Sequence, residues 1–511
     1  MIEDKKEETN DNPSLIERLK DPNFLKGIST VFGAILVNLI VGSIFGLCTL
    51  VVYQVSYIKG IDPDNFITID HLSFYYPFEV IFQCLSSFLT GMIEKKIGLH
   101  LTNLLGFTIL GLGYFTMYLS KNFFIDILSM ILGGIGTGII YYPSTKNACL
   151  WFMKHSGLVI GIIETTISLG SFLFALIGEK IINIDEVPSH EDDDLYDLEI
   201  GKNIKNYLIV QIICLIGVFI LSFLLMFMKK EEIEVKKEVE KMKPIELKTQ
   251  SDFSEGNVDE NLGSALIEKE NQPVESIEKK NFKKMLWVAA KSKRLILYAV
   301  ISVLTAQGPS MIFTLYRGIG EYFKINMKTL QLLGSVNFIF ECLSGIIIGI
   351  LCDYVNLKLL LLIIGIINSA LVLTYCLTFS NDSAFFWITN IESFVNGGIF
   401  PFNDCYLMRV FGTEIYIELI GYVSFVTNLF VVAMSPLAYF VESKVEKKEN
   451  AYWILFSIFG FFNFIAFALS FFINAEPFNY EERMGLLSNR IESNSNSNSN
   501  SNKPQEEITQ G

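Results

Sequence analysis

Long apolar segments alternate with short polar turns along most of the chain, and one strongly polar stretch divides them into two sets of six. The hydrocarbon core of a bilayer needs about 20 apolar residues per helical span. Segments of about that length lie near residues 30–54, 71–93, 99–119, 122–144, 156–178, 207–228, 294–317, 328–351, 358–379, 384–408, 416–440 and 452–474. The pattern predicts an all-α membrane protein with twelve transmembrane helices in two six-helix pseudo-repeats.

Polar sequence at both ends and in the middle sets the expected domain boundaries. Residues 230–282 mix both charge signs with few aromatic residues, and residues 476–511 contain the run SNSNSNSNSN. Such segments cannot bury enough apolar area to offset the entropy lost on ordering. We expect a cytoplasmic arm (1–29), a first six-helix half (30–229), a charged cytoplasmic linker (230–291), a second six-helix half (292–475) and a disordered cytoplasmic tail (476–511).

Composition narrows the classes of function. The chain is 51% hydrophobic, yet its formal net charge is −14, so most acids must lie outside the membrane core. The eight cysteines and four histidines lack metal-ligand spacing, and we expect no metal, cofactor or disulfide framework. Neither a GxxxxGK[ST] loop nor an HExxH or GxSxG motif occurs, which disfavours an ATP-driven pump and an enzyme. The expected partners are the lipid bilayer and a small-molecule substrate, without nucleic acid, and the expected state is a monomer.

The placement of lysine and arginine predicts the orientation, because cytoplasmic loops are enriched in both. If both termini are cytoplasmic, that side receives the lysine-rich linker together with Lys95, Lys96 and Arg409. The opposite side receives the acidic loop 190–199. Two further bases near span ends, Lys146 and Arg317, are expected to extend toward the interface.

The turns after the second and eighth spans share a pattern of glycine and charge. Gly91, Lys95 and Gly98 mark the first turn, and Gly349 and Asp353 mark the second. Glycine lets two helices approach, and an acid can meet a helix N-terminus. Both turns resemble the inter-helix motif of the major facilitator superfamily, which implies gating roles for Gly91, Gly98, Gly349 and Asp353. The first turn departs from that motif, because Lys95 stands where the acid is usual.

A second resemblance runs from the fourth span into the fifth. Residues 133–143 read GGIGTGIIYYP, and WF and GL follow within 151–158. With the Gly-Gly and Pro of 397–401, they resemble the oxalate/formate antiporter and monocarboxylate transporter branch of the superfamily. The resemblance implies a mono- or dicarboxylate substrate bound at the midplane between the halves, with Tyr141 lining the cavity.

The ionisable residues well inside the spans are acids. Anion carriers of that branch resemble one another in placing cations on the eighth or eleventh helix. Here neither residues 329–351 of the eighth span nor the eleventh span contains lysine or arginine. A charged carboxylate at the bilayer centre costs about 2.5–3.5 kcal/mol on insertion scales, so each acid must be compensated or protonated. The expected proton-coupling residues, with Glu341 first and Glu164 next, are Glu341, Glu164, Glu79 and Glu392.

Helical spacing places these acids on polar stripes, because residues three or four apart share a face. Polar stripes in membrane helices face the bundle interior or a water-filled cavity. The residues expected to bind substrate are Tyr141, Gln83, Gln307, Asn337 and Asn396.

These observations predict a secondary carrier that works by alternating access. A mono- or dicarboxylate moved with proton coupling or by exchange is the first choice of substrate. An amino acid or another zwitterion is the alternative, because the spans are rich in acids and poor in bases. A nutrient sensor or receptor that uses the carrier fold without net transport is the alternative from another class.

The C-terminal tail carries a candidate sorting signal. Glu482 precedes Leu486 and Leu487 in the spacing of an acidic dileucine motif, which sorting adaptors read. This pattern predicts an endolysosomal or vacuolar membrane, and the plasma membrane is the alternative.

Overall fold

The computed structural model describes residues 21–63, 66–187, 195–229, 274–445 and 447–480, which contain helices and no strands. A long helix lies at each of the twelve predicted spans, so the predicted all-α fold is confirmed. The six in the first half are α2 (Pro22–Ile61), α3 (Tyr75–Ile97), α4 (Leu99–Leu119), α5 (Phe123–Trp151), α6 (Ser156–Ile182) and α8 (Ile204–Leu225). The six in the second half are α12 (Lys293–Tyr322), α13 (Met327–Tyr354), α14 (Leu357–Thr374), α15 (Asp382–Phe411), α16 (Tyr416–Lys444) and α17 (Lys448–Ser470).

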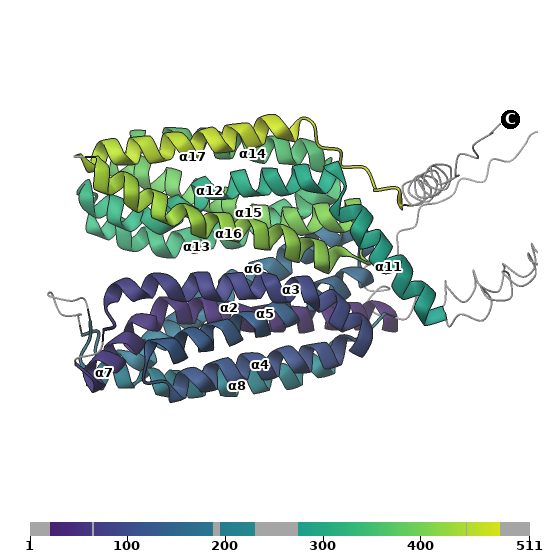
Figure 1. The fold of residues 1–511 in the computed structure, drawn as a ribbon, viewed down its shortest axis with the longest axis horizontal. Coiled ribbons are helices and arrows are strands. Elements are labelled where there is room, and N and C mark those ends of the chain that lie inside the picture. The colour runs from purple at the N-terminus through teal and green to yellow at the C-terminus, as the bar shows by residue number, and fades with distance from the viewer. Residues whose placement is uncertain (1–20, 64–65, 188–194, 230–273, 446, 481–511) are drawn as a thin grey trace, which may run out of the picture.

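The two sets of six helices form two adjacent bundles with roughly parallel axes (Figure 1). Helix α11 (Val274–Ala290) and the starts of α2 and α12 lie at one end of the molecule, here called the linker end. The short helices η1 (Ile69–Phe74) and α7 (Leu198–Lys202) lie at the opposite end, here called the loop end. Two pairs of helices join the bundles most extensively, α6 with α13 and α3 with α16. We call these contacts the α6–α13 seam and the α3–α16 seam.

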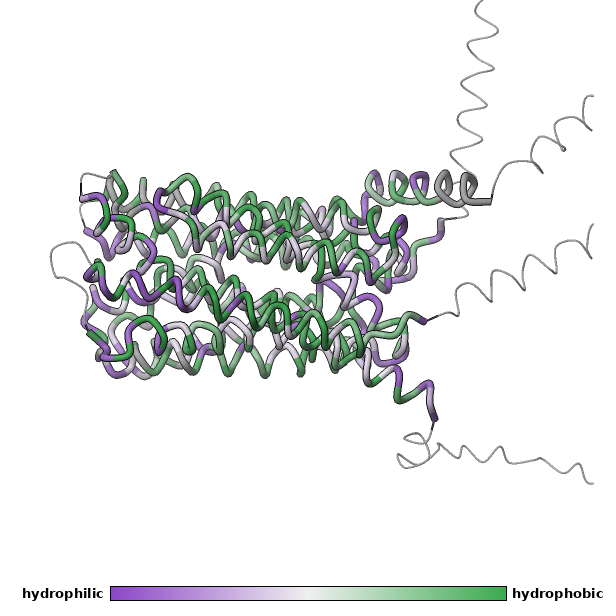
Figure 2. The backbone as a smooth tube through the Cα atoms, turned by 90° about the horizontal axis from the view of Figure 1, so that it is seen from below, coloured by the Kyte–Doolittle hydropathy of each residue, from purple (hydrophilic) through white to green (hydrophobic). Residues whose placement is uncertain are grey.

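Hydropathy follows the same axis. Polar positions gather at the two ends of the bundle, and the middle is mostly apolar (Figure 2). Ten of the described helices are apolar and long enough to cross a membrane by composition alone. Two of the twelve long helices, α3 and α15, are outside that set. Both contact the opposite bundle, α3 through α16 and α15 through α6, so the two helices outside that set lie at the junction of the halves.

Short-range signals explain several helix ends. Asp21 accepts a hydrogen bond from the Asn23 backbone N–H at 2.9 Å and caps α2, with Pro22 at the first position. Gly98 and Gly412 end α3 and α15 with φ angles of 79° and 87°, which glycine adopts without strain. A Cβ added at either glycine would meet nothing within 4 Å, so both turn the chain and neither permits a close helix contact.

Candidate functional site

At the linker end of the α6–α13 seam, two helices touch backbone to backbone. A Cβ added to Gly157 would lie 2.3 Å from the carbonyl oxygen of Gly349, and one added to Gly161 would lie 2.3 Å from that of Gly345. No side chain fits at such a distance. Glycine is therefore required for the two halves to approach this closely.

The same seam continues toward the loop end through polar and aromatic contacts. The Thr165 hydroxyl donates to the carbonyl oxygen of Cys342 at 2.9 Å. The rings of Phe172 and Phe338 stack with their centroids 4.4 Å apart. Between these two contacts, Glu341 on α13 lies close to Ser168 on α6. The structure thus places Glu341 in the junction of the halves.

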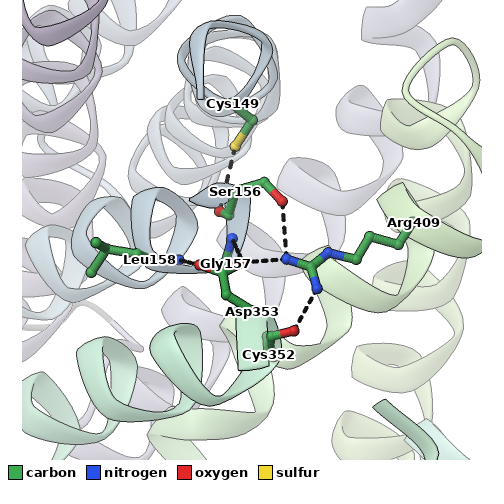
Figure 3. A network of polar contacts seen from close by, with 7 residues as sticks. All are labelled: Cys149, Ser156, Gly157, Leu158, Cys352, Asp353 and Arg409. Carbon is green, nitrogen blue, oxygen red and sulfur yellow. Dashed lines mark hydrogen bonds and ion pairs between the residues drawn. The ribbon is translucent and has the colours of Figure 1, made fainter. Parts of the chain in front are cut away.

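Asp353, at the linker end of α13, binds the N-terminus of α6 in the other half. Its Oδ1 accepts from the Gly157 N–H at 2.8 Å, and its Oδ2 accepts from the Leu158 N–H at 2.9 Å (Figure 3). These amides belong to the first turn of a helix, where backbone N–H groups lack intrahelical partners and the helix dipole favours negative charge. The side chain of Asp353 is only 2% exposed.

Arg409, near the end of α15, completes this network. Its guanidinium forms an ion pair with Asp353 and donates to the carbonyl oxygen of Cys352. It also donates to the Ser156 hydroxyl at 3.2 Å (Figure 3). One arginine therefore joins α15, α13 and the start of α6. The sequence pattern singled out Asp353 but assigned Arg409 only to the charge bias of the loops.

In the α3–α16 seam the motif turn supplies a base, Lys95, whereas in the α6–α13 seam it supplies an acid, Asp353. A Cβ added to Gly91 would lie 2.1 Å from Oε1 of Glu418, which is buried in the first turn of α16. Lys95, one turn along α3, donates to the backbone oxygen of Glu414 at 2.7 Å. Its Nζ also lies 3.1 Å from the ring centroid of Phe282 in α11. Here the base comes from the motif turn and the acid from the facing helix.

A second ion pair supports α3 from within the first half. Lys146 on α5 lies 3.3 Å from Glu94 on α3, and their side chains are 13% and 14% exposed. Lys146, which was expected to extend toward the interface, is mostly covered and pairs with the half-buried Glu94 of the same bundle. Arg317 is exposed and pairs with Glu321 on its own helix.

A pair of acids lies where α6 meets α15. The carboxyl groups of Glu164 on α6 and Asp404 on α15 lie within hydrogen-bonding reach of each other and are almost completely buried. The Tyr141 hydroxyl donates to Oε2 of Glu164 at 2.5 Å. Sequence reasoning identified Tyr141 and Glu164 but missed Asp404.

The other two predicted proton-coupling acids are buried elsewhere. Glu79 lies against α5, where the Thr137 hydroxyl donates to its Oε1 at 3.4 Å. Glu392 is buried in α15, and neither of its carboxyl oxygens has a hydrogen-bond partner among the described residues.

Of the four predicted substrate-binding amides, two are buried and two are half-buried. Gln307 and Asn337 are buried, and each has a side-chain oxygen without a partner in the described part of the chain. Gln83 and Asn396 are half-buried. A cavity of about 270 Å³ opens at the loop end, and none of the five predicted substrate residues lines it. Its lining residues are Thr329, Leu332, Asp382, Ser383 and Phe386. The sorting residues Glu482, Leu486 and Leu487 lie outside the described residues.

Two solved structures share this arrangement. The proton:xylose symporter XylE bound to 6-bromo-6-deoxy-D-glucose superposes with a TM-score of 0.60 and 14% sequence identity, over 90% of this chain and 99% of that chain. A variant of the E. coli fucose:proton symporter FucP gives a TM-score of 0.55 and 10% identity, over 86% of this chain and 98% of that chain. At these identities, the likeness establishes the fold.

Sequence comparison gives a family and one partial relative. The chain is 28% identical to monocarboxylate transporter 9 of Gallus gallus over 79 residues, which are 16% of this chain and 16% of that protein. The sequence model of the Major Facilitator Superfamily matches residues 30–320 and 298–485, which together cover most of the chain. The chain therefore belongs to the Major Facilitator Superfamily and is a multi-pass membrane transporter.

Proposed function

We propose that this transporter moves a small organic solute by alternating access, and that the linker end faces the cytoplasm. Both seams are in contact at the linker end through glycine and polar contacts. This arrangement supports a state in which the linker end is shut. Opening requires the two halves to separate there, while the loop end closes.

The contacts that must break are compatible with such a motion. Asp353 accepts from two amides of the opposite half, and Lys95 donates to a carbonyl of the opposite half. Water can replace either partner once the seam opens, so the polar groups remain satisfied in both states. In the proposed gate, Gly91 and Gly349 permit contact, Asp353 fastens it, and Gly98 fixes the turn after α3.

We infer that the substrate is a mono- or dicarboxylate that moves with protons. The observation that carries this inference is a set of acids inside the helices that have no ion-pair partner among the described residues. Glu79, Glu164 and Glu392 are buried, and Glu341 is half-buried in the α6–α13 seam. An ionised acid would repel an anionic substrate, and its protonation removes that repulsion. The partial relative is named a monocarboxylate transporter, and both structural neighbours are named proton symporters, which is consistent with this choice.

In this scheme Glu341 is the main proton-coupling residue. It lies at the junction of the halves, so it can be exposed to one side of the membrane and then to the other. Glu164, Glu79 and Glu392 are further candidates. Tyr141, Gln83, Gln307, Asn337 and Asn396 remain the proposed substrate contacts.

A zwitterion such as an amino acid is the second candidate substrate. The buried oxygens of Gln307 and Asn337 lack partners among the described residues and could accept hydrogen bonds from an ammonium group. An ionised buried acid would attract the same group, and this candidate needs no proton to remove a repulsion.

Uptake by purified protein in proteoliposomes tests the proposal. Radiolabelled lactate, pyruvate, formate and oxalate are compared with a panel of amino acids at external pH 5.5 and 7.5. The proposal predicts uptake of at least one carboxylate, faster at pH 5.5. Uptake of amino acids alone would reverse the order of the two candidates. Specific binding without flux of any solute would instead favour a sensor.

A further inference from the structure

The contact between Glu164 and Asp404 joins the two halves of the molecule. Glu164 belongs to α6 of the first half, and Asp404 belongs to α15 of the second half. Their side chains are within hydrogen-bonding reach, although two ionised carboxylates have only acceptors to offer. Oε1 of Glu164 and Oδ2 of Asp404 are both buried without a partner among the described residues. A single proton between the groups would satisfy both.

Among the described residues, hydroxyl groups surround the pair and no cation binds it. Neither acid forms an ion pair within the described ranges. Arg409 lies nearby, but it is bound to Asp353. Among the described residues, the titratable groups that face the pair are Tyr141, Tyr142 and Cys149 of α5, Tyr298 of α12 and Tyr416 of α16. On the far side of Cys149 lie Asp353 and Cys352 of α13 and Cys405 and Arg409 of α15.

Electrostatics restricts the charge that this pair can hold. Two carboxylates that share a buried site repel strongly, and one of them keeps its proton, as in other closely coupled acid pairs. Tyr141 donates to Glu164, which stabilises one negative charge on the pair but cannot compensate two. The contact seen here therefore requires at least one bound proton.

We propose that Glu164 and Asp404 form one proton-binding site across the two halves, and that this proton holds the linker end closed. This inference rests on the proposed function and adds Asp404 to its residues. When α6 and α15 separate, each carboxyl group meets water and the shared proton leaves. Opening of the linker end is thereby coupled to release of one proton on that side.

The sign of the pH dependence follows from proton counting. The closed state binds one proton more than the open state, so acid favours closure and alkali favours opening. The ratio of open to closed molecules should rise by up to about tenfold per pH unit in the range where the pair titrates, because one proton is exchanged.

Electron–electron distance measurements between two spin labels test this site. The labels replace Lys154, which precedes α6, and Tyr354, the last residue of α13, both of which are exposed. The half-buried Cys48, Cys214 and Cys342 are first changed to serine so that they do not react. In the otherwise unchanged protein, the longer distances should gain population between pH 5.5 and 8.5.

Two variants assign that response to the pair. In Glu164→Gln, and separately in Asp404→Asn, the new amide can donate to the remaining carboxylate without a proton. Each variant should keep the short distances at both pH values. Asp126→Asn is the matched control, because Asp126 is also buried but binds Tyr75 and Gln54 within the first half. That control should keep the full response.

The outcomes separate this inference from the proposed function. Distances that ignore pH in the unchanged protein, or a full response in both variants, would overturn the proton site. If neither variant gives monodisperse protein, the pH response of the distances in the unchanged protein still decides whether the proton site is kept or overturned. Uptake assays on the same preparations then test the transport proposal independently of the proton site. A pH response without uptake of any solute keeps the proton site and overturns the transport proposal, and uptake without a pH response does the reverse.

Discussion

Replacing Gly161 with alanine should weaken the closed state of the linker end. The added Cβ would lie 2.3 Å from the carbonyl oxygen of Gly345, and 3.1 Å from both the Gly345 carbonyl carbon and the Gly349 Cα. Ordinary contact begins at 3.4 Å, so the nearest atom is about 1.1 Å too close. All three neighbours are backbone atoms, and no side chain can rotate away. Helices α6 and α13 must therefore move apart by about 1 Å.

The size of the effect follows from the cost of overpacking. An added methyl group in a well-packed contact typically costs about 1–3 kcal/mol. Because the open state has no such contact, the substitution should change the ratio of open to closed molecules by about 5- to 150-fold. The spin labels at positions 154 and 354 report this as a gain of longer distances at constant pH.

A control shows whether the contact or the residue type matters. Gly217 lies in α8, and a Cβ added there would meet nothing within 4 Å. Gly217→Ala should leave the distance distribution unchanged. If Gly161→Ala gives the same distribution as the parent, backbone contact across the α6–α13 seam does not hold the linker end closed, and our interpretation of the glycines is wrong.

Three further predictions concern the gate, the proton and the tail. Asp353→Asn should raise the ratio of open to closed molecules by about 10- to 150-fold, because the loss of a charge-assisted contact typically costs about 1.5–3 kcal/mol. Adding Arg409→Gln should cost little more, and additive effects would show that the two residues act separately. Glu341→Gln should retain binding but lose the difference between uptake at pH 5.5 and 7.5, and an unchanged difference would exclude Glu341 as the coupling acid. Leu486→Ala with Leu487→Ala should move a fluorescently tagged transporter toward the cell surface, and a parent that is already at the surface would refute the sorting motif.

Sequence pattern alone predicted the spans well, because each helix must satisfy its backbone polar groups inside a bilayer. The helix ends were less predictable. The first span was expected at 30–54, whereas α2 covers Pro22–Ile61, since a cap at Asp21 and the polar residues that follow extend it beyond the apolar run. Hydropathy cannot locate ends that capping and loop contacts determine.

Site residues could be predicted from the sequence where the pattern that identifies them lies within one helix. The stripe through Glu164 and the motif around Asp353 depend on spacing within one segment, and both residues lie at the junction of the halves. Asp404 was missed because it lies close to the end of the predicted tenth span, and charged residues there are usually solvated. Its burial, like the contact of Lys146 with Glu94, depends on neighbours that are distant in the sequence. Spacing along one helix does not identify such neighbours.

Reversible cross-linking of the α6–α13 seam tests the central claim of alternating access most directly. Thr165 faces native Cys342, with its hydroxyl 2.9 Å from the Cys342 carbonyl oxygen and the Cys342 sulfur 3.9 Å from the Thr165 carbonyl oxygen. In Thr165→Cys, mild oxidation should join the halves, and uptake of whichever solute the parent transports should stop. Reductant should restore it, and Thr165→Cys with Cys342→Ala should be insensitive to both reagents. Full uptake by protein shown to be cross-linked would contradict the account.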